Sequence, residues 1–300
     1  MSEKKSTLTT TAYTLKDKNV SEPVAVASFQ HGDTTNKTAY IVPGYYTAPI
    51  HYEDLAALTA EKGIELLPID IVGAPTIITE PFKKYEEHDI IAAWASASHY
   101  AITEHEHTTT RDVEALVGYS LGGAAAVLTA LELPHIKKVV LIGPVGSTSI
   151  FERALLWLYT FTLTKPLGDA LFRIFFMLQV YISVQQTKRD IANNIPALKR
   201  FEKTKAETLR KEIEGAKAAG YKAGVAKMRF QLPTYLAALK KRGVSVEFIL
   251  FDKDHYVSTS SLQKMADRLE IPTQRVPHGH NRLKNRPEDL APAITKALSR

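Results

Sequence analysis

Short apolar runs alternate with longer amphipathic stretches over most of the chain. Runs bounded by turn residues predict strands at residues 8–15, 24–29, 38–42, 64–69, 113–117, 138–142, 244–251 and 273–276. Apolar residues at helical spacing predict helices at residues 52–62, around 85–94, at 122–133 and 260–269, and a last helix that begins near Pro287. From the third strand onward, strands and helices alternate, which predicts an α/β fold with a mainly parallel central sheet and helices on both faces.

One long segment interrupts this alternation. About 100 residues between Gly143 and Val244 contain no convincing strand, whereas a crossover between parallel strands needs little more than a dozen. We therefore predict an inserted α-helical cap, or lid, at residues 147–232, with a core formed by residues 1–146 and 233–300. The first part of the cap is rich in aromatic and aliphatic residues, which predicts an apolar roof over the core.

The composition excludes some kinds of site and indicates where in the cell the protein is expected. The chain has no cysteine, so disulfides, zinc–thiolate sites and thiol catalysis are excluded. Its first residues are polar and lack the apolar stretch of a signal peptide, which leads us to expect a cytoplasmic protein. Charged residues and a proline interrupt the most apolar region, residues 154–184, so we expect no transmembrane segment there.

The positive charge is concentrated in one segment. The net charge is +6, but residues 188–242 hold 15 Lys and Arg against 5 Asp and Glu. Acidic residues at helical spacing accompany these cations, for example Glu207 four positions before Lys211, which is typical of a solvated amphipathic helix. We therefore expect no nucleic-acid partner.

The strongest chemical motif is Gly118-Tyr119-Ser120-Leu121-Gly122, which matches G-x-S-x-G. It follows a predicted strand and opens a predicted helix, so the turn would expose the Ser120 hydroxyl in a strained backbone conformation near a helix N-terminus. The flanking glycines are expected because side chains there would clash with the neighbouring strand and helix. A dinucleotide-binding loop would need a glycine at position 120. Ser120 is therefore the candidate nucleophile.

These residues and their order resemble the α/β-hydrolase family, whose members place nucleophile, acid and histidine in that order. The resemblance covers most of the chain and implies an α/β-hydrolase fold. It implies that His280, in Gly279-His280-Asn281 before the last helix, is the base, with His278 as the fallback. It also implies that the backbone N–H groups of Leu121 and Tyr45 form the oxyanion hole, because Pro43-Gly44-Tyr45 resembles the oxyanion loop of the family.

Two aspartates compete for the acid. Asp252 and Asp254 both follow a predicted strand, at the sheet edge where α/β folds gather functional groups. Alignment with the family favours Asp254, although Phe251 stands where the family has a glycine. Either aspartate could instead be a turn former.

Other histidines carry weaker cases. His99, His105 and His107 could bind a metal, but they lie in a polar stretch without clear periodicity, which we interpret as a solvated loop. His51 could face the site or cap the helix that begins near Tyr52. We expect no metal and no organic cofactor.

The resulting expectation is a carboxylesterase or lipase-like serine hydrolase. The substrate would be a small ester with an apolar acyl or alcohol group, cleaved through an acyl-enzyme. Thioesters and carbon–carbon bonds are alternative substrates. A non-catalytic scaffold that binds a hydrophobic small molecule or partner is the alternative from another class, and the apolar cap could also contact a membrane surface. The sequence does not indicate an oligomeric state.

Overall fold

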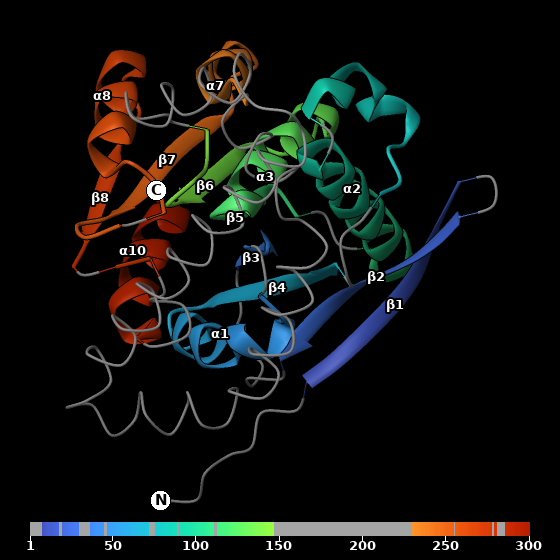
Figure 1. The fold of residues 1–300 in the computed structure, drawn as a ribbon. Helices are drawn as coiled ribbons and strands as arrows, with labels where there is room; N and C mark the ends of the chain where they lie inside the picture. Colours follow the sequence, from blue (N-terminus) through green and yellow to red (C-terminus); the bar gives the residue numbers. More distant parts are fainter. Residues whose placement is uncertain are drawn as a thin grey trace, which may run out of the picture.

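The structure of the protein is a computed structural model that describes residues 8–17, 20–29, 37–44, 47–71, 76–88, 90–110, 113–146, 230–254, 256–277, 279–280 and 286–300. Its centre is an eight-stranded sheet in the order β1-β2-β4-β3-β5-β6-β7-β8 (Figure 1). The strands are β1 (Leu8–Asp17), β2 (Val20–Phe29), β3 (Lys37–Val42), β4 (Ile64–Ile71), β5 (Ala115–Tyr119), β6 (Lys138–Ile142), β7 (Ser245–Phe251) and β8 (Thr273–Val276). β2 runs antiparallel to both β1 and β4. The other strands, β3 to β8, run parallel to one another.

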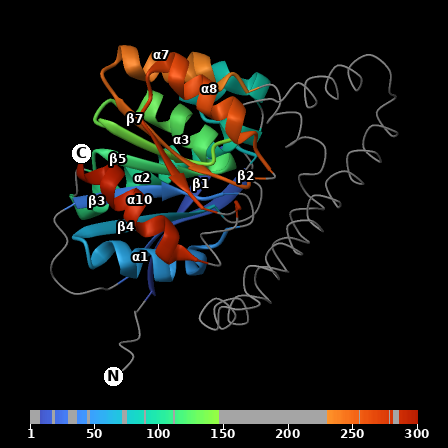
Figure 2. The ribbon, with the colours of Figure 1, turned by 90° about the vertical axis from the view of Figure 1, so that its left-hand side faces the viewer.

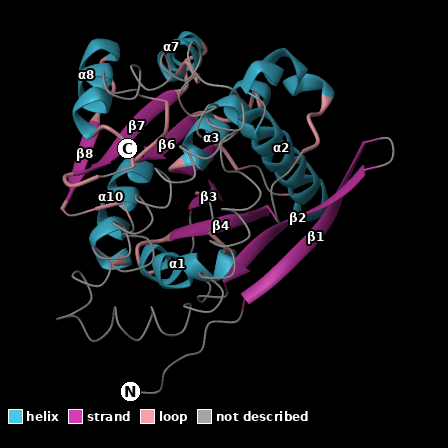
Figure 3. Ribbon diagram, in the orientation of Figure 1, coloured by secondary structure: helices cyan, strands magenta, loops and turns pink. Residues whose placement is uncertain are grey.

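Helices cover both faces of this sheet, as Figures 2 and 3 show. α2 (Ile90–Thr109), α3 (Leu121–Glu132), α7 (Leu232–Lys241) and α8 (Thr259–Leu269) share one apolar cluster with the sheet, whereas α1 (Glu53–Ala60) and α10 (Pro287–Ser299) share the other. Two 3-10 helices, η1 (Pro49–Tyr52) and η2 (Glu80–His88), precede α1 and α2. The predicted fold class, a mainly parallel sheet with helices on both faces, is confirmed.

Alternation along the parallel strands explains why they read as continuous apolar runs. In β3, Tyr40 and Val42 belong to one core cluster, while Ala39 and Ile41 belong to the other. Successive side chains of a strand point to opposite faces, and both faces are buried in the middle of the sheet, so most positions there are apolar. The sheet therefore presents its functional residues at the ends of the strands.

The predicted positions of most elements agree with the structure. β6 and β8 have the predicted bounds, and α1, α3, α8 and α10 lie within a few residues of theirs. The helix predicted around residues 85–94 covers the end of η2 and the start of α2, which continues to Thr109. The other strands differ from the prediction by a few residues at their ends. β2 is the largest of these differences among the strands: it begins at Val20 because its first residues pair with β1 alone, and it joins β4 only from Val24 to Val26.

The interpretation of the His- and Thr-rich stretch as a solvated loop is wrong. α2 continues through this stretch to Thr109, so His99, His105 and His107 all lie on a helix. His105 is buried, and its Nδ1 lies 2.9 Å from the hydroxyl of Tyr40 on β3. The helix buries a histidine here because that hydroxyl satisfies it, which a count of apolar positions cannot detect.

The two described ends of the predicted insertion lie together. A Cβ on Gly146, which has φ +106°, would lie 2.8 Å from Cβ of Leu232 and 2.9 Å from Cδ1 of Phe230. Leu232, which was assigned to the cap, is buried in the core at the start of α7. Phe230, also assigned to the cap, is buried in the same core, and residues 147–229 lie outside the described residues. Among the helices that are described, none is long and apolar enough to cross a membrane.

Candidate active site

Ser120 occupies a strained turn between β5 and α3. Its backbone angles are φ 55° and ψ −120°, a region that residues other than glycine rarely adopt. The turn is held from both sides: the N–H of Ser120 donates to the carbonyl of Ile142 (2.9 Å), and its own carbonyl accepts from Gly123 (2.9 Å) and Val145 (3.2 Å). Neighbouring structure thus fixes a conformation that leaves the side chain of Ser120 only partly buried.

The glycines around Ser120 are required by close packing, as the sequence predicts. A Cβ on Gly118 would lie 2.6 Å from Cα of Gly123, where α3 passes over β5. A Cβ on Gly122 would overlap the carbonyl oxygen of Pro43 at the end of β3. These contacts let α3 begin directly over the strand ends, so its N-terminus lies beside Ser120.

Asp254 and His280 form a buried pair. Nδ1 of His280 lies 2.6 Å from Oδ2 of Asp254, and the side chains are 7% and 0% exposed. The other carboxylate oxygen of Asp254, Oδ1, accepts hydrogen bonds from the backbone N–H groups of Tyr256 (2.8 Å) and Val257 (3.0 Å). These contacts orient the carboxylate toward the imidazole.

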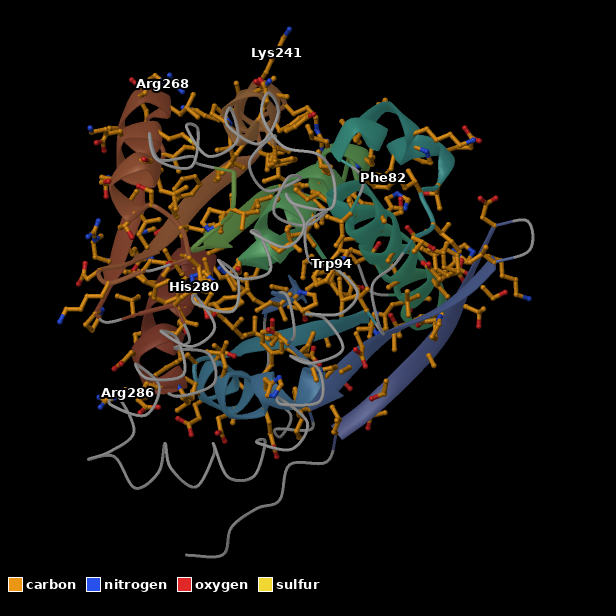
Figure 4. All side chains as sticks on the ribbon, in the orientation of Figure 1. Phe82, Trp94, Lys241, Arg268, His280 and Arg286 are labelled. Atoms are coloured by element: carbon orange, nitrogen blue, oxygen red, sulfur yellow. The ribbon has the colours of Figure 1, made fainter. Side chains whose placement is uncertain are left out.

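The imidazole of His280 lies in a pocket of rings near the carboxyl ends of β5 and β6, where Figure 4 labels it. The rings of Tyr119, Phe251 and Tyr256 have their centroids 5.2 to 5.5 Å from that of the imidazole. Gly143, which follows β6, contacts the edge of the imidazole, because a Cβ at that position would lie 3.1 Å from Nδ1. Packing and the carboxylate together determine how the ring is oriented.

The backbone at the end of β6 contacts both Ser120 and His280. Ser120 donates to Ile142, and the imidazole of His280 packs against the next residue, Gly143. Nε2 of His280 is buried and has no hydrogen-bond partner among the described residues, and the side chains of Ser120 and His280 are not hydrogen-bonded to each other. Because Nδ1 contacts Asp254, Nε2 is the ring nitrogen left to accept a proton. A hydrogen bond between a nucleophile and its base often forms fully only when substrate binds.

The structure separates the two candidate aspartates. Asp252 is exposed and pairs with Arg275 at 2.9 Å, on the outside of the molecule. Asp254 is the aspartate that reaches His280. Leu121 is the first residue of α3, a position whose N–H has no acceptor within the helix. Tyr45 and His278 lie outside the described residues.

The capping contact of His51 is made in η1 and not in the predicted helix that begins near Tyr52, because His51 itself lies in η1 and the N-cap of α1 is Tyr52. Nδ1 of His51 accepts a hydrogen bond from the backbone N–H of Ala48 (2.9 Å) at the start of η1. His99 packs edge-on against Phe82, and burial lowers the pKa of His99. Within the described part of the chain, no three His, Asp or Glu side chains are arranged to hold a metal ion.

Tyr119 is a site residue that the sequence analysis did not identify. It occupies the first variable position of G-x-S-x-G, and its hydroxyl donates to the backbone carbonyl of His280. Burial is the main reason why the pKa of Tyr119 is raised well above its usual value, and Tyr52, Asp254 and Tyr256 raise it further. The only available signal was a tyrosine at a position that the motif leaves open.

Comparison with known proteins identifies the fold. The model of the alpha/beta hydrolase family matches residues 39–293. A search of curated protein sequences finds no match. The chain resembles many solved structures, all of the following at low sequence identity.

The 2-hydroxy-6-oxo-6-phenylhexa-2,4-dienoate hydrolase of Rhodococcus sp. strain RHA1 is 15% identical, with a TM-score of 0.58 over 98% of this chain and 100% of that one. A serine hydrolase of Cycloclasticus zankles is 14% identical, with a TM-score of 0.57 over 97% and 98%. A carboxylesterase structure from Nitrososphaera gargenis is 11% identical, with a TM-score of 0.55 over 96% and 98%. At these identities the likeness concerns the fold alone.

Proposed function

We propose that this chain, which belongs to the alpha/beta hydrolase family, is a serine hydrolase that cleaves carboxylic esters through an acyl-enzyme. One observation carries the proposal. A buried carboxylate–imidazole pair lies at the same end of the sheet as a serine held in a strained turn at a helix N-terminus. The family as a whole supports hydrolysis, and the residues at this site favour a serine as the nucleophile.

In the proposed first step, Oγ of Ser120 attacks the ester carbonyl while Nε2 of His280 takes the hydroxyl proton. Asp254 keeps the proton of the imidazole on Nδ1 and stabilises the positive charge that develops on the ring, because its Oδ2 lies 2.6 Å from Nδ1. The two backbone N–H donors to its Oδ1 keep the carboxylate from turning away.

The negative charge that forms on the carbonyl oxygen needs donors that are already in place. We assign this role to the backbone N–H groups of Leu121 and Tyr45. Collapse of the tetrahedral intermediate breaks the bond to the alcohol, which leaves with the proton from His280. A water molecule then attacks the acyl group on Ser120 by the same steps in reverse, and the acid is released.

We propose a small ester with an apolar acyl or alcohol group as the substrate. The support comes from the aromatic surroundings of His280, where Tyr119, Phe251 and Tyr256 line the site, and from the aromatic residues of the predicted cap. Thioesters and activated carbon–carbon bonds require the same nucleophile and are the alternatives to test alongside esters.

The test is a panel of nitrophenyl esters of increasing acyl length and matched thioesters, assayed with the wild-type protein and with Ser120→Ala. We expect kcat with Ser120→Ala to fall by roughly 10⁴- to 10⁶-fold, since triad serines contribute that much in a well-studied protease. Ser260→Ala, at an exposed serine on α8, is the control and should keep full activity. Equal turnover by wild type and Ser120→Ala would refute the proposal.

A further inference from the structure

Tyr119 connects the strand that carries the nucleophile to the loop that carries the histidine. It is the last residue of β5, directly before Ser120, and it is buried. Its hydroxyl donates to the backbone carbonyl of His280, 161 positions further along the chain. Its ring also packs against the imidazole, with the centroids 5.4 Å apart and the planes inclined by 39°. One side chain thus contacts both the backbone and the ring of His280.

Two glycines make room for this arrangement. The ring of Tyr119 lies against Gly44, where a Cβ would be 2.5 Å from Cδ1 of the tyrosine. The imidazole of His280 lies against Gly143, where a Cβ would be 3.1 Å from Cε1. The ring of Tyr119 therefore lies against the backbone that follows β3, and the imidazole lies against the backbone that follows β6.

Two restraints determine where Nε2 of His280 points. Asp254 holds Nδ1, and Tyr119 holds the carbonyl of the same residue. Among the described residues, the bond from Tyr119 is the hydrogen bond that reaches the backbone of His280. Because burial raises the pKa of Tyr119, its hydroxyl keeps its proton over the working pH range and remains a donor.

We propose that Tyr119 is a positioning residue, whose hydroxyl fixes the backbone of the His280 loop so that Nε2 faces the Ser120 hydroxyl. This inference rests on the proposed serine hydrolase function and adds a fourth side chain to it. Displacement of a catalytic group by about 1 Å lowers turnover by up to about 100-fold, so one hydrogen bond at this position has a large effect on rate.

The first test is Tyr119→Phe, which removes the hydroxyl and keeps both ring contacts. We expect kcat for a nitrophenyl ester to fall about 10- to 100-fold while KM changes by less than about twofold, because the imidazole and not the binding surface is displaced. The rate of inactivation by a fluorophosphonate should fall by the same factor, since that reaction needs the same proton transfer.

Tyr100→Phe is the matched control. The hydroxyl of Tyr100 also donates to a backbone carbonyl, that of Thr14 at 3.0 Å, but it joins α2 to β1 away from the site. Both variants lose one tyrosine hydroxyl bonded to a carbonyl, so a general effect of that loss on folding would appear in both. Kinetic constants of Tyr100→Phe should match those of the wild type.

A double substitution separates positioning from a structural effect. In a His280→Ala protein no imidazole is left to position, so adding Tyr119→Phe should change the residual rate by less than about twofold. If Tyr119→Phe lowers the rate equally in both backgrounds, the hydroxyl acts independently of His280 and the inference is wrong. Wild-type kinetics in Tyr119→Phe, or a failure of this variant to fold, would also overturn it.

The outcomes distinguish this inference from the function on which it rests. A wild-type protein that hydrolyses esters and loses this activity in Ser120→Ala confirms the function, whatever Tyr119→Phe does. If the function is confirmed and Tyr119→Phe is fully active, only the inference fails. If Ser120→Ala is as active as the wild type, both fail.

Discussion

Replacement of Asp254 by asparagine gives the sharpest test of the buried pair, because the two side chains have the same shape. In the wild type, Oδ1 accepts two backbone N–H groups and Oδ2 faces Nδ1 of His280. Asparagine has a single oxygen, which the two N–H groups of Tyr256 and Val257 will hold. Its NH₂ group then faces Nδ1 of His280.

An amide donor opposite Nδ1 reverses the tautomer of the imidazole. Nδ1 must then accept, so the proton moves to Nε2 and the ring can no longer take the proton of Ser120. Turning the amide by 180° would restore the tautomer, but it would give up the two partly buried hydrogen bonds from Tyr256 and Val257 at about 1–3 kcal/mol each. The correct arrangement therefore lies about 2–6 kcal/mol higher, which corresponds to roughly 30- to 25,000-fold in population.

Loss of the carboxylate charge, which stabilises the imidazolium, adds to this effect. We therefore expect kcat of Asp254→Asn to be about 10³- to 10⁴-fold below that of the wild type, close to the effect of the equivalent change in a serine protease. Asp252→Asn is the matched control, since this carboxylate is exposed and pairs with Arg275. The assay is steady-state ester hydrolysis, with circular dichroism to verify folding.

The reasoning would be refuted by an Asp254→Asn protein that retains more than about a tenth of wild-type kcat. It would equally be refuted if Asp252→Asn lost activity and Asp254→Asn did not, since the acid would then be the exposed residue.

Three further substitutions test the packing around the site. Gly122→Ala would place a Cβ against the carbonyl of Pro43, so we expect a loss of about 1–3 kcal/mol in urea unfolding together with lower ester turnover; wild-type values for both would contradict this. Arg242→Ala removes three hydrogen bonds to carbonyls at the end of α3 (2.7, 2.7 and 3.0 Å), which should lower the free energy of unfolding by about 1–2 kcal/mol with kcat unchanged. Burial lowers the pKa of His99 in the folded protein, so the unfolded chain binds a proton more readily below about pH 6.5. The free energy of unfolding should therefore fall as the pH drops from about 6.5 to the lower pKa of the folded state. Thermal melts at pH 7.5 and pH 5 should show a smaller drop in Tm for His99→Gln than for the wild type.

Most of the fold could be predicted from the sequence because local pattern and global architecture agree. β6 is a short apolar run, and β8 is a short stretch between Pro272 and Pro277; the structure keeps the predicted bounds of both. α2 was predicted too short because its second half is rich in Thr and His, which weaken an amphipathic pattern. Its buried positions nevertheless continue at helical spacing from Ala101 to His105, where Tyr40 supplies the partner. A sequence pattern predicts that a polar residue such as His105 is exposed, because the pattern does not include the hydrogen bond from a distant strand that allows the residue to be buried.

Some residues of the candidate site could be predicted from the sequence and others could not. G-x-S-x-G between a strand and a helix identifies Ser120, because the close approach of backbones imposes glycines at fixed offsets. Asp252 and Asp254 follow the same strand, and nothing local determines which carboxylate turns inward. The structure separates them by burial and by two backbone N–H donors to Asp254. The role proposed for Tyr119 depends on a contact across 161 positions, which no local pattern carries.

Labelling with a fluorophosphonate, followed by peptide mapping, tests the central claim most directly, because the reagent forms a stable bond only with a serine whose proton a neighbouring base removes. We predict a single adduct on Ser120 of the folded protein, and its loss in His280→Ala. An adduct on a different residue, or undiminished labelling of Ser120 without the imidazole, would contradict the account.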